Sequence, residues 1–359
     1  MTILDIAHLR LHNQAIAPSH LATAGDVVRQ LGAVQGQDYL GTLWALGLRR
    51  QQAVEADIEQ AIANREIVRT WPMRGTLHFV APEDVRWMLA LLTPRIIARA
   101  ARRYNQLELD EPTFDHSETV FAKALQDGNS LTRPEIMAAL EEAGISTKGQ
   151  RGYHLLWHAA QNGLICFGPR QGKQDTFVWL DDWLPAGKVL NRDESLAELA
   201  RRYFTGHGPA TLQDFIWWSG LLTADARAAV EMVAAELEEV VIDGQTYWLT
   251  STDPVSKDPS PTVYLLPGFD EYLLGYRDRS AVLDPAHNDK IVPGGNGMFK
   301  STIVIDGQVV GTWKRTLRKK SVTIELEPFN ALSEAERETI ATAAEAYGAF
   351  LERMVNFTN

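Results

Sequence analysis

The amino-acid sequence predicts an α+β fold in which tandem winged-helix modules, each a set of helices followed by a β-wing, precede a small β-rich, barrel-like C-terminal domain. Two observations lead to this prediction. A helical spacing of apolar residues followed by a hairpin pattern occurs three times in succession between residues 1 and 253. A linker rich in proline, serine and aspartate then covers residues 251–262, and beyond it the pattern is that of strands.

The first winged-helix module covers residues 1–112. One of its predicted helices carries Glu55 and Asp57 in its first turn, where the helix dipole favours acidic side chains. Residues 67–80 then mix β-branched and aromatic side chains around a proline and a glycine, which is typical of a hairpin. Helices followed by a hairpin are characteristic of a winged helix, and a further helix is expected at 82–104.

The second and third modules, residues 113–187 and 188–253, repeat this order of elements without a close sequence repeat. In the second, Thr132 and Glu135 flank a proline as the N-cap and third residue of a predicted helix. Its wing is expected at 164–180. The wing of the third module turns at an Asp-Gly pair between alternating apolar residues, which is a strong hairpin signal.

The C-terminal domain is expected to cover residues 254–359. Four of its segments alternate or run β-branched and are predicted strands: 263–266, 301–305, 309–315 and 321–326. A helix from Ser333 to about Met354 is expected to close the domain. Ser333 and Glu336 have the spacing of a capping box at its start.

Two groups of residues are interpreted as core packing. The single cysteine, Cys166, lies in an apolar run, so no intramolecular disulfide is possible and a reducing cytoplasm is the expected compartment. Phe215, Trp217 and Trp218 lie in a predicted helix, where aromatic residues usually belong to the core.

The composition excludes several classes of protein. With 359 residues, 45% of them hydrophobic, the chain is long enough for several small domains with their own cores. No stretch approaches about 18 uncharged apolar residues, so neither secretion nor membrane insertion is indicated. The formal net charge of −11 argues against a protein that coats nucleic acid, so any DNA-binding face is local. The nine histidines are scattered and no Cys-x-x-Cys or glycine-rich phosphate loop occurs, so neither a metal nor a cofactor is expected.

Gln35 and Gln37, separated by Gly36, are the candidate catalytic residues. Side chains two positions apart diverge by roughly 200° on an α-helix but point the same way in an extended stretch. Apolar residues carry helical spacing as far as Val34, and Gly36 permits the backbone to leave the helical region. The pair is therefore expected at a helix exit, where the two side chains can converge.

A converging pair of glutamines can hold and orient one water molecule, because each amide offers an acceptor oxygen and two donor protons. Neither side chain is a strong base, so any hydrolysis that they assist requires a good leaving group or depends mainly on positioning and electrostatic stabilisation. Asp38 is the nearest carboxylate, but adjacent extended residues point in opposite directions and it ranks well below the glutamines. The alternative interpretation is that the pair caps a helix end or bridges two elements.

Basic residues without neighbouring acids are the candidate contacts to DNA phosphates. The strongest cluster has five bases at a predicted strand pair and its turn. A second cluster lies on one face of the helix at 82–104, and three further bases lie in the first two wings. The predicted residues are Lys314, Arg315, Arg318, Lys319 and Lys320; Arg95, Arg99 and Arg102; and Arg74, Arg170 and Lys173. Solvated faces, ion pairs and ordinary turns remain the alternative for each group.

Two further positions complete the candidate sites. The loop at 293–299, which includes Asn296, allows a close backbone approach to a ligand and carries apolar residues suited to probing DNA, although a plain flexible turn also explains it. His78 shares a strand face with Arg74, and a hydrogen-bonded structural histidine is preferred there over a ligand or an acid. Between residues 270 and 279, acidic and aromatic side chains could supply an alternative carboxylate base.

Long and unusual stretches give this sequence a specific resemblance to the winged-helix DNA glycosylase family typified by AlkZ and YcaQ. They are AVQGQDY (33–39), RTWPMRGTLHFV (69–80), GQRGYHLLW (149–157), GLICFGPRQGKQ (163–174), GPATLQDFIWWSGL (208–221), LLPGFDEYLLGYRDR (265–279) and DGQVVGTWKR (306–315). Members resembling AlkZ carry Gln-x-Gln, and those resembling YcaQ carry Gln-x-Asp. Gln35 and Gln37 match the former, with Gly36 where an apolar side chain is usual.

The resemblance implies a monofunctional glycosylase that hydrolyses the N-glycosidic bond of bulky N7-alkylated purines in double-stranded DNA and extends to interstrand crosslinks. Gln35 and Gln37 would position the attacking water, and a cytoplasmic monomer is expected. A non-catalytic winged-helix transcriptional regulator is the first alternative, with the third helix of one module in a major groove. A genotoxin-resistance protein that binds the alkylating agent itself is the second.

Overall fold

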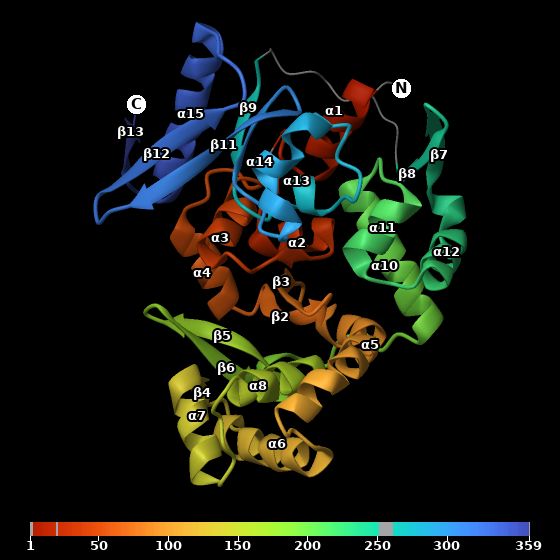
Figure 1. The fold of residues 1–359 in the computed structure, drawn as a ribbon, viewed down its shortest axis with the longest axis vertical. Helices are drawn as coiled ribbons and strands as arrows, with labels where there is room; N and C mark the ends of the chain where they lie inside the picture. The colour runs from red at the N-terminus through yellow and green to blue at the C-terminus, as the bar shows by residue number, and fades with distance from the viewer. Residues whose placement is uncertain (1–2, 19–20, 251–260, 359) are drawn as a thin grey trace. The chain divides into compact units, whose positions relative to one another are not determined.

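The computed structural model describes residues 3–18, 21–250 and 261–358, which form two compact units. Unit 1 combines residues 1–58 with 197–359, and unit 2 consists of residues 59–196 (Figure 1). The chain passes between them in helices α4 (Glu55–Ala63) and α10 (Arg192–His207). The module boundaries at 112, 187 and 253 remain a prediction.

Unit 2 contains the first two predicted wings. Strands β2 and β3 form one antiparallel hairpin, and β5 and β6 form another, with β4 paired to the outer side of β6. The strands are β2 (Val68–Met73), β3 (Thr76–Val80), β4 (Ser130–Thr132), β5 (Ile165–Gln171) and β6 (Gln174–Trp179). The helices are α5 (Val85–Gln106), α6 (Glu111–Leu125), α7 (Arg133–Glu142), α8 (Arg151–Gln161) and α9 (Leu180–Trp183).

Local sequence signals account for several of these boundaries. Thr132 caps α7, because its backbone N–H and its hydroxyl both donate to the Glu135 carboxylate at 2.7 Å. Cys166 is fully buried on β5, and burial raises the pKa of its thiol. Both features confirm the predictions from the sequence.

The helical part of unit 1 joins segments from both halves of the chain. It comprises α1 (Ile3–Asn13), α2 (Ala24–Leu31), α3 (Tyr39–Gly47), α11 (Leu212–Ser219), α12 (Thr223–Met232), and a hairpin of β7 (Glu238–Ile242) and β8 (Gln245–Leu249). The hairpin turns at Asp243 and Gly244, both with positive φ, as predicted.

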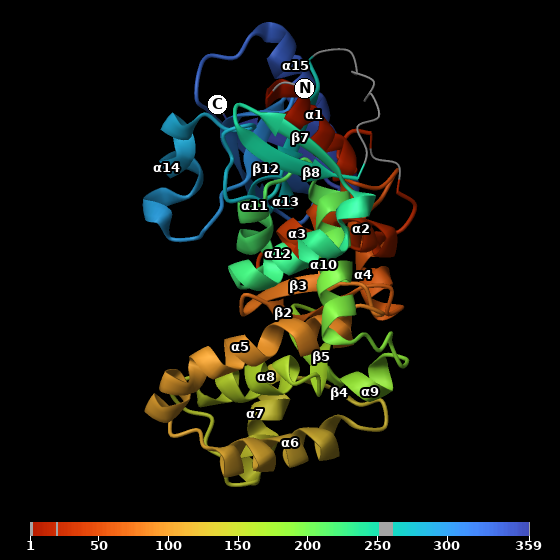
Figure 2. The ribbon, with the colours of Figure 1, turned by 90° about the vertical axis from the view of Figure 1, so that its right-hand side faces the viewer.

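The C-terminal part of unit 1 is a five-stranded sheet in the order β13-β12-β11-β10-β9. The strands are β9 (Val263–Leu266), β10 (Thr302–Ile305), β11 (Gln308–Leu317), β12 (Ser321–Pro328) and β13 (Met354–Thr358), with β9 and β13 at the edges. Helix α15 (Glu334–Phe350) packs against β9 and β12 (Figure 1). The short helices α13 (Glu271–Leu274) and α14 (Asn288–Ile291) lie between β9 and β10 in sequence, and Figure 2 shows α14 projecting away from the sheet.

Two predictions about this unit were wrong. The closing helix ends at Phe350, and Met354 begins β13, which pairs in parallel with β12. No turn motif in the sequence precedes this strand, although Glu352 turns the chain with a φ of +53°. Trp217 is 43% exposed, whereas its neighbour Trp218 is fully buried. Adjacent residues on a helix point about 100° apart, and here Trp218 lies on the buried face of α11 while Trp217 lies at its edge, with its indole N–H donating to the Leu274 carbonyl at 3.0 Å.

No described helix combines the length and the apolar content that would be needed to cross a bilayer.

Candidate active site

The two candidate glutamines lie between α2 and α3, with Gln35 in a short strand and Gln37 at the bend that follows it. Helix α2 ends at Leu31, and Gly32 reverses the chain with a φ of +73°. A Cβ added at Gly32 would come within 3.1 Å of the Arg202 Cβ, so two constraints favour glycine there. The helix exit was predicted correctly but assigned to Gly36. Gly32 makes the exit instead, and Val34–Gln35 is already a strand, β1.

The backbone of Gln35 is fixed on both sides. Its N–H donates to Oε1 of Glu271 at 3.2 Å, and its carbonyl oxygen accepts from the Thr42 hydroxyl at 2.8 Å. Thr42 lies on α3 and also donates to the carbonyl of Asp38, so the first turn of that helix is tied to the motif. Gln35 is buried, whereas Gln37 is exposed. The exposed amide of Gln37 can therefore meet a substrate without first being uncovered.

Asp38 is occupied by structural contacts. Its Oδ1 accepts from the backbone N–H of Gly41, which caps the N-terminus of α3. Nη2 of Arg315, on β11, lies 3.2 and 3.1 Å from the two carboxylate oxygens of Asp38, and Nη1 of the same guanidinium donates to the Tyr347 hydroxyl at 3.1 Å. These contacts support the low rank given to Asp38 as a base.

A buried polar cluster lies behind the motif, and the sequence did not indicate that its members meet. Glu271, at the start of α13, is 1% exposed. Its Oε2 lies 3.1 Å from the indole nitrogen of Trp218 and 3.2 Å from Nε2 of His207. Next to it, Asp270 forms a bidentate ion pair with Arg49, at 2.8 and 2.9 Å. The alternative carboxylates expected between residues 270 and 279 therefore include one, Glu271, in direct contact with the motif.

The arrangement provides two neutral amide groups on a segment in which Glu271 and Thr42 hold the backbone of Gln35. Glutamine amides can orient a water molecule by donating and accepting hydrogen bonds, but they cannot take up its proton. Asp38 follows the motif directly, and Glu271 accepts a hydrogen bond from its backbone. Both carboxylates also accept hydrogen bonds from other groups of the protein. The site therefore suits the hydrolysis of a bond whose leaving group departs readily.

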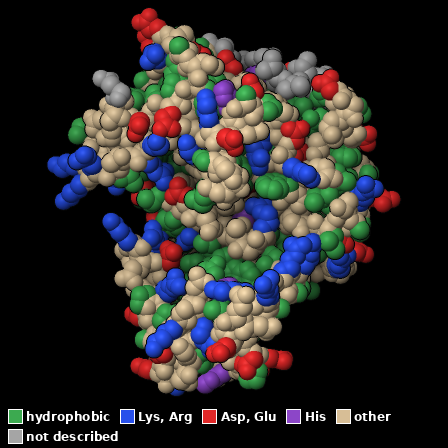
Figure 3. Space-filling model, in the orientation of Figure 1, with side chains coloured by type: hydrophobic (Ala, Val, Ile, Leu, Met, Phe, Trp, Pro, Cys, Tyr) green, Lys and Arg blue, Asp and Glu red, His purple; other side chains and the backbone are tan. Residues whose placement is uncertain are grey.

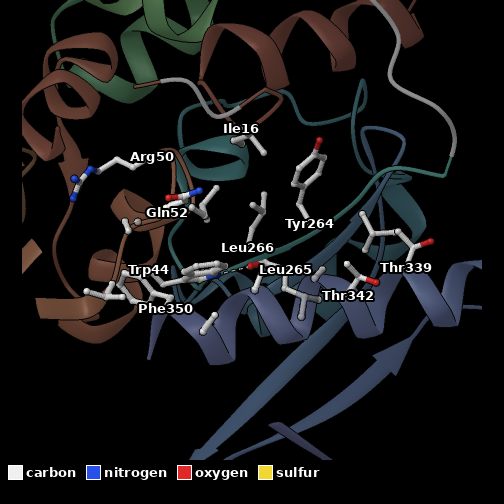
Figure 4. Close-up of a pocket in the computed structure, with 18 residues that line it drawn as sticks. Ile16, Trp44, Arg50, Gln52, Tyr264, Leu265, Leu266, Thr339, Thr342 and Phe350 are labelled. Carbon is white, nitrogen blue, oxygen red and sulfur yellow. Dashed lines mark hydrogen bonds between the residues drawn. The ribbon is translucent and has the colours of Figure 1, made fainter. Parts of the chain in front are cut away.

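A cavity of about 610 Å³ lies elsewhere in unit 1. It is mostly apolar and lies between α3, β9 and α15, as Figure 4 shows. The indole nitrogen of Trp44 donates to the Leu265 carbonyl across its floor at 2.7 Å (Figure 4). Neither Gln35 nor Gln37 lines it, so this cavity does not define the candidate active site.

The strongest predicted DNA-contact cluster divides between the strand and the tip of the β11–β12 hairpin. Arg318, Lys319 and Lys320 are exposed at the tip, where Figure 3 shows lysine and arginine side chains protruding. On the strand, Arg315 is held by Asp38, and Lys314 pairs with Glu327. The tip thus presents three bases outward, whereas the two strand bases are each engaged by a carboxylate.

The loop at 293–299 presents a mixed surface. The Asn296 carboxamide oxygen accepts from the backbone N–H of Met298 at 2.9 Å, which closes a tight turn. Met298 is 58% exposed, whereas Phe299 is buried beneath the loop. Of the apolar residues expected at the tip, Met298 is therefore the one that is presented to solvent.

In unit 2 the predicted contact residues differ in exposure. Arg99 and Arg102 are exposed on α5, and Arg95 is half-buried on the same helix. At the second wing, Lys173 is exposed, whereas Arg170 pairs with Asp175 at 3.1 Å.

Arg74 lies at the turn of the first wing, beside a buried histidine. Its Nη2 is 3.2 Å from Nε2 of His78, whose Nδ1 is 2.9 Å from the Thr76 carbonyl. Burial, and secondarily the charge of Arg74, lower the pKa of His78 well below its usual value. His78 is thus a neutral, hydrogen-bonded histidine, in agreement with the interpretation of the sequence.

Within the described ranges, no three or more His, Cys, Asp or Glu side chains are grouped so that they could hold a metal ion.

Comparison with known proteins identifies relatives over most of the chain. The model of the family described as DNA glycosylase AlkZ-like matches residues 28–350. An interstrand DNA cross-link repair glycosylase from Streptomyces sahachiroi is 27% identical over 326 residues, which cover 85% of each chain. The solved structure of Streptomyces sahachiroi DNA glycosylase AlkZ matches with a TM-score of 0.80 at 24% identity and full coverage of both chains. This last match confirms the α+β fold class.

Proposed function

Because this chain belongs to the AlkZ-like family of DNA glycosylases, we propose that it hydrolyses the N-glycosidic bond of bulky N7-alkylated purines in double-stranded DNA, interstrand crosslinks included. The observation that supports this proposal most directly is the Gln35-Gly36-Gln37 motif within the matched region, in which Glu271 and Thr42 hold the backbone of Gln35. The relative that is named for cross-link repair supports the extension to crosslinks.

In the proposed reaction the protein does not have to protonate or otherwise activate the leaving group. Alkylation at N7 places a positive charge on the purine, so the bond between N9 and the anomeric carbon breaks with its electron pair passing to the ring, and the base leaves neutral. Water adds to the anomeric carbon, and the proton that it loses passes to solvent. The products are the free alkylated base and an abasic site. Gln35 and Gln37 orient the water, which lowers the barrier through positioning.

The experiment that tests the proposal measures release of free base from a duplex that carries one N7-alkylguanine, with small and bulky alkyl groups compared. We expect release well above the spontaneous rate for the bulky adduct under single-turnover conditions. Release no faster than the spontaneous rate for every adduct would overturn the proposal. Sequence-specific binding of an undamaged duplex would then favour a regulator, and tight binding of the free alkylating agent without base release would favour a resistance protein.

The tip of the β11–β12 hairpin gives a separate prediction about DNA binding. If Arg318, Lys319 and Lys320 each contact one phosphate, their combined replacement by alanine lowers the magnitude of the slope of log K against log salt by about three. Affinity should fall equally on damaged and undamaged duplexes. The control is Arg227→Ala, which removes an exposed arginine from α12. An unchanged slope in the triple variant would show that the tip does not contact phosphates.

A further inference from the structure

Three buried carboxylates of unit 1 differ in the charge of their partners. Asp270 is paired with Arg49, and Asp214 lies 3.9 Å from a guanidinium nitrogen of Arg10. The hydrogen bonds to Glu271 come instead from a backbone N–H, an indole N–H and an imidazole nitrogen. Glu271 is therefore held by hydrogen-bond donors, and one of them is the backbone of Gln35.

The ring of His207 is held in place beside this carboxylate. Its Nε2 faces Glu271, and because a carboxylate only accepts, Nε2 carries the proton. Its Nδ1 is buried and has no hydrogen-bond partner among the described residues. The ring stacks on Tyr203 with centroids 4.8 Å apart.

We infer that Glu271 is a positioning residue for glycosidic-bond cleavage, which acts through the backbone of Gln35; the inference rests on the proposed function. One carboxylate oxygen holds the Gln35 N–H, and the other is locked by Trp218 and His207. The carboxylate therefore links the motif to α10 and α11 and prevents the extended segment from shifting. Both of its oxygens already accept hydrogen bonds from the protein, so we do not assign it as the base.

The variant that tests this role is Glu271→Gln, which keeps the size of the side chain. All three neighbours of the carboxylate donate, whereas a glutamine amide offers one accepting oxygen and a donating –NH₂ group. The single accepting oxygen is expected to face the two side-chain donors, Trp218 and His207, which turns the –NH₂ group toward the Gln35 N–H and releases that backbone. We expect the single-turnover rate constant to fall about 100-fold, as a shift of about 1 Å at reacting groups can cause. The DNA concentration that gives half-maximal rate should stay within about threefold, because no DNA contact is removed.

The matched control is Asp214→Asn. It removes a carboxylate of equal burial from the same unit, which is also held by backbone N–H groups, those of Thr211, Arg277 and Asp278. No hydrogen bond or ion pair joins it to Gln35 in the described structure. Both variants are compared at temperatures equally far below their unfolding midpoints. A merely structural role would lower the rate constant equally in the two, whereas positioning lowers it in Glu271→Gln alone.

A second measurement does not depend on activity. Amide hydrogen exchange at Gln35 should be slow in the wild type and in Asp214→Asn, and at least tenfold faster in Glu271→Gln, because the –NH₂ group of the glutamine cannot accept the hydrogen bond that the carboxylate oxygen accepts. If wild type releases no base, the proposed function fails while exchange still tests the anchoring. If wild type releases base and Glu271→Gln matches its rate constant, or if exchange at Gln35 is unchanged, the inference is overturned.

Discussion

Replacement of Gln37 by alanine is expected to lower the single-turnover rate constant for base release by about 100- to 1,000-fold, the loss typical of removing one group that orients or stabilises a transition state. The amide is exposed and lies in a backbone fixed by Gln35 and Thr42, so its removal should leave the fold intact. DNA affinity should be unchanged within about threefold, because a neutral amide contributes little to phosphate binding.

Two further variants test whether the loss of base release is specific to the Gln-x-Gln motif. Gln51→Ala removes an exposed glutamine outside the motif and should keep the wild-type rate constant. Gln35→Ala should lose activity as Gln37→Ala does, and its unfolding midpoint must be measured because Gln35 is buried. Base release by Gln37→Ala at the wild-type rate would show that Gln37 does not orient the attacking water.

Replacement of Arg49 by methionine is expected to lower the free energy of unfolding of unit 1 by about 3–5 kcal/mol, because it leaves a buried carboxylate without its partner. The Arg49 guanidinium is 1% exposed and donates to both oxygens of Asp270. It also donates to the carbonyls of Gln14 and Ala45, so three segments lose a shared donor. Urea unfolding, followed by the fluorescence of the buried tryptophans, measures the change.

The same measurement on two companion variants identifies the cause. Arg50→Ala changes the next residue, which donates to the Ala22 carbonyl outside the buried pair, and should cost no more than about 0.5 kcal/mol. Arg49→Met combined with Asp270→Leu should recover part of the loss, because no charge is then left unpaired. If the double variant is as unstable as the single one, the cost comes from packing and not from the uncompensated charge.

Elements with local signals could be predicted from the sequence. The capping box of Ser333 and Glu336 marks the start of α15, and the Asp-Gly turn marks the β7–β8 hairpin. Both motifs involve residues within about four positions of each other, so they can be recognised in the sequence alone. Strand β13 lacks such a signal, because its identity as a strand depends on pairing with β12.

The candidate site divides in the same way. The spacing of Gln35 and Gln37 and the need for an extended backbone were visible in the motif. The contact between Gln35 and Glu271 spans 236 residues, and no periodicity or composition links two positions so far apart. His207 and Trp218 likewise meet Glu271 only because α10, α11 and α13 pack together. The solvent exposure of the basic side chains could not be predicted from the sequence either. Arg315 and Arg318 belong to one run of bases, yet Arg315 is held by Asp38 and Arg318 is exposed.

The composition of unit 1 from both ends of the chain sets the order in which the protein can mature during synthesis. Unit 2 is continuous, so all of its contacts are available once residue 196 has left the ribosome. Residues 1–58 emerge first, but their contacts within unit 1 cannot form until the segment from 197 onward has been made. The hydrogen bond between Gln35 and Glu271 is among these late contacts. A nascent or truncated chain that stops before α13 therefore carries the motif without its anchor. Assembly of the anchored motif thus becomes a late event, reached only after most of the polypeptide has been made.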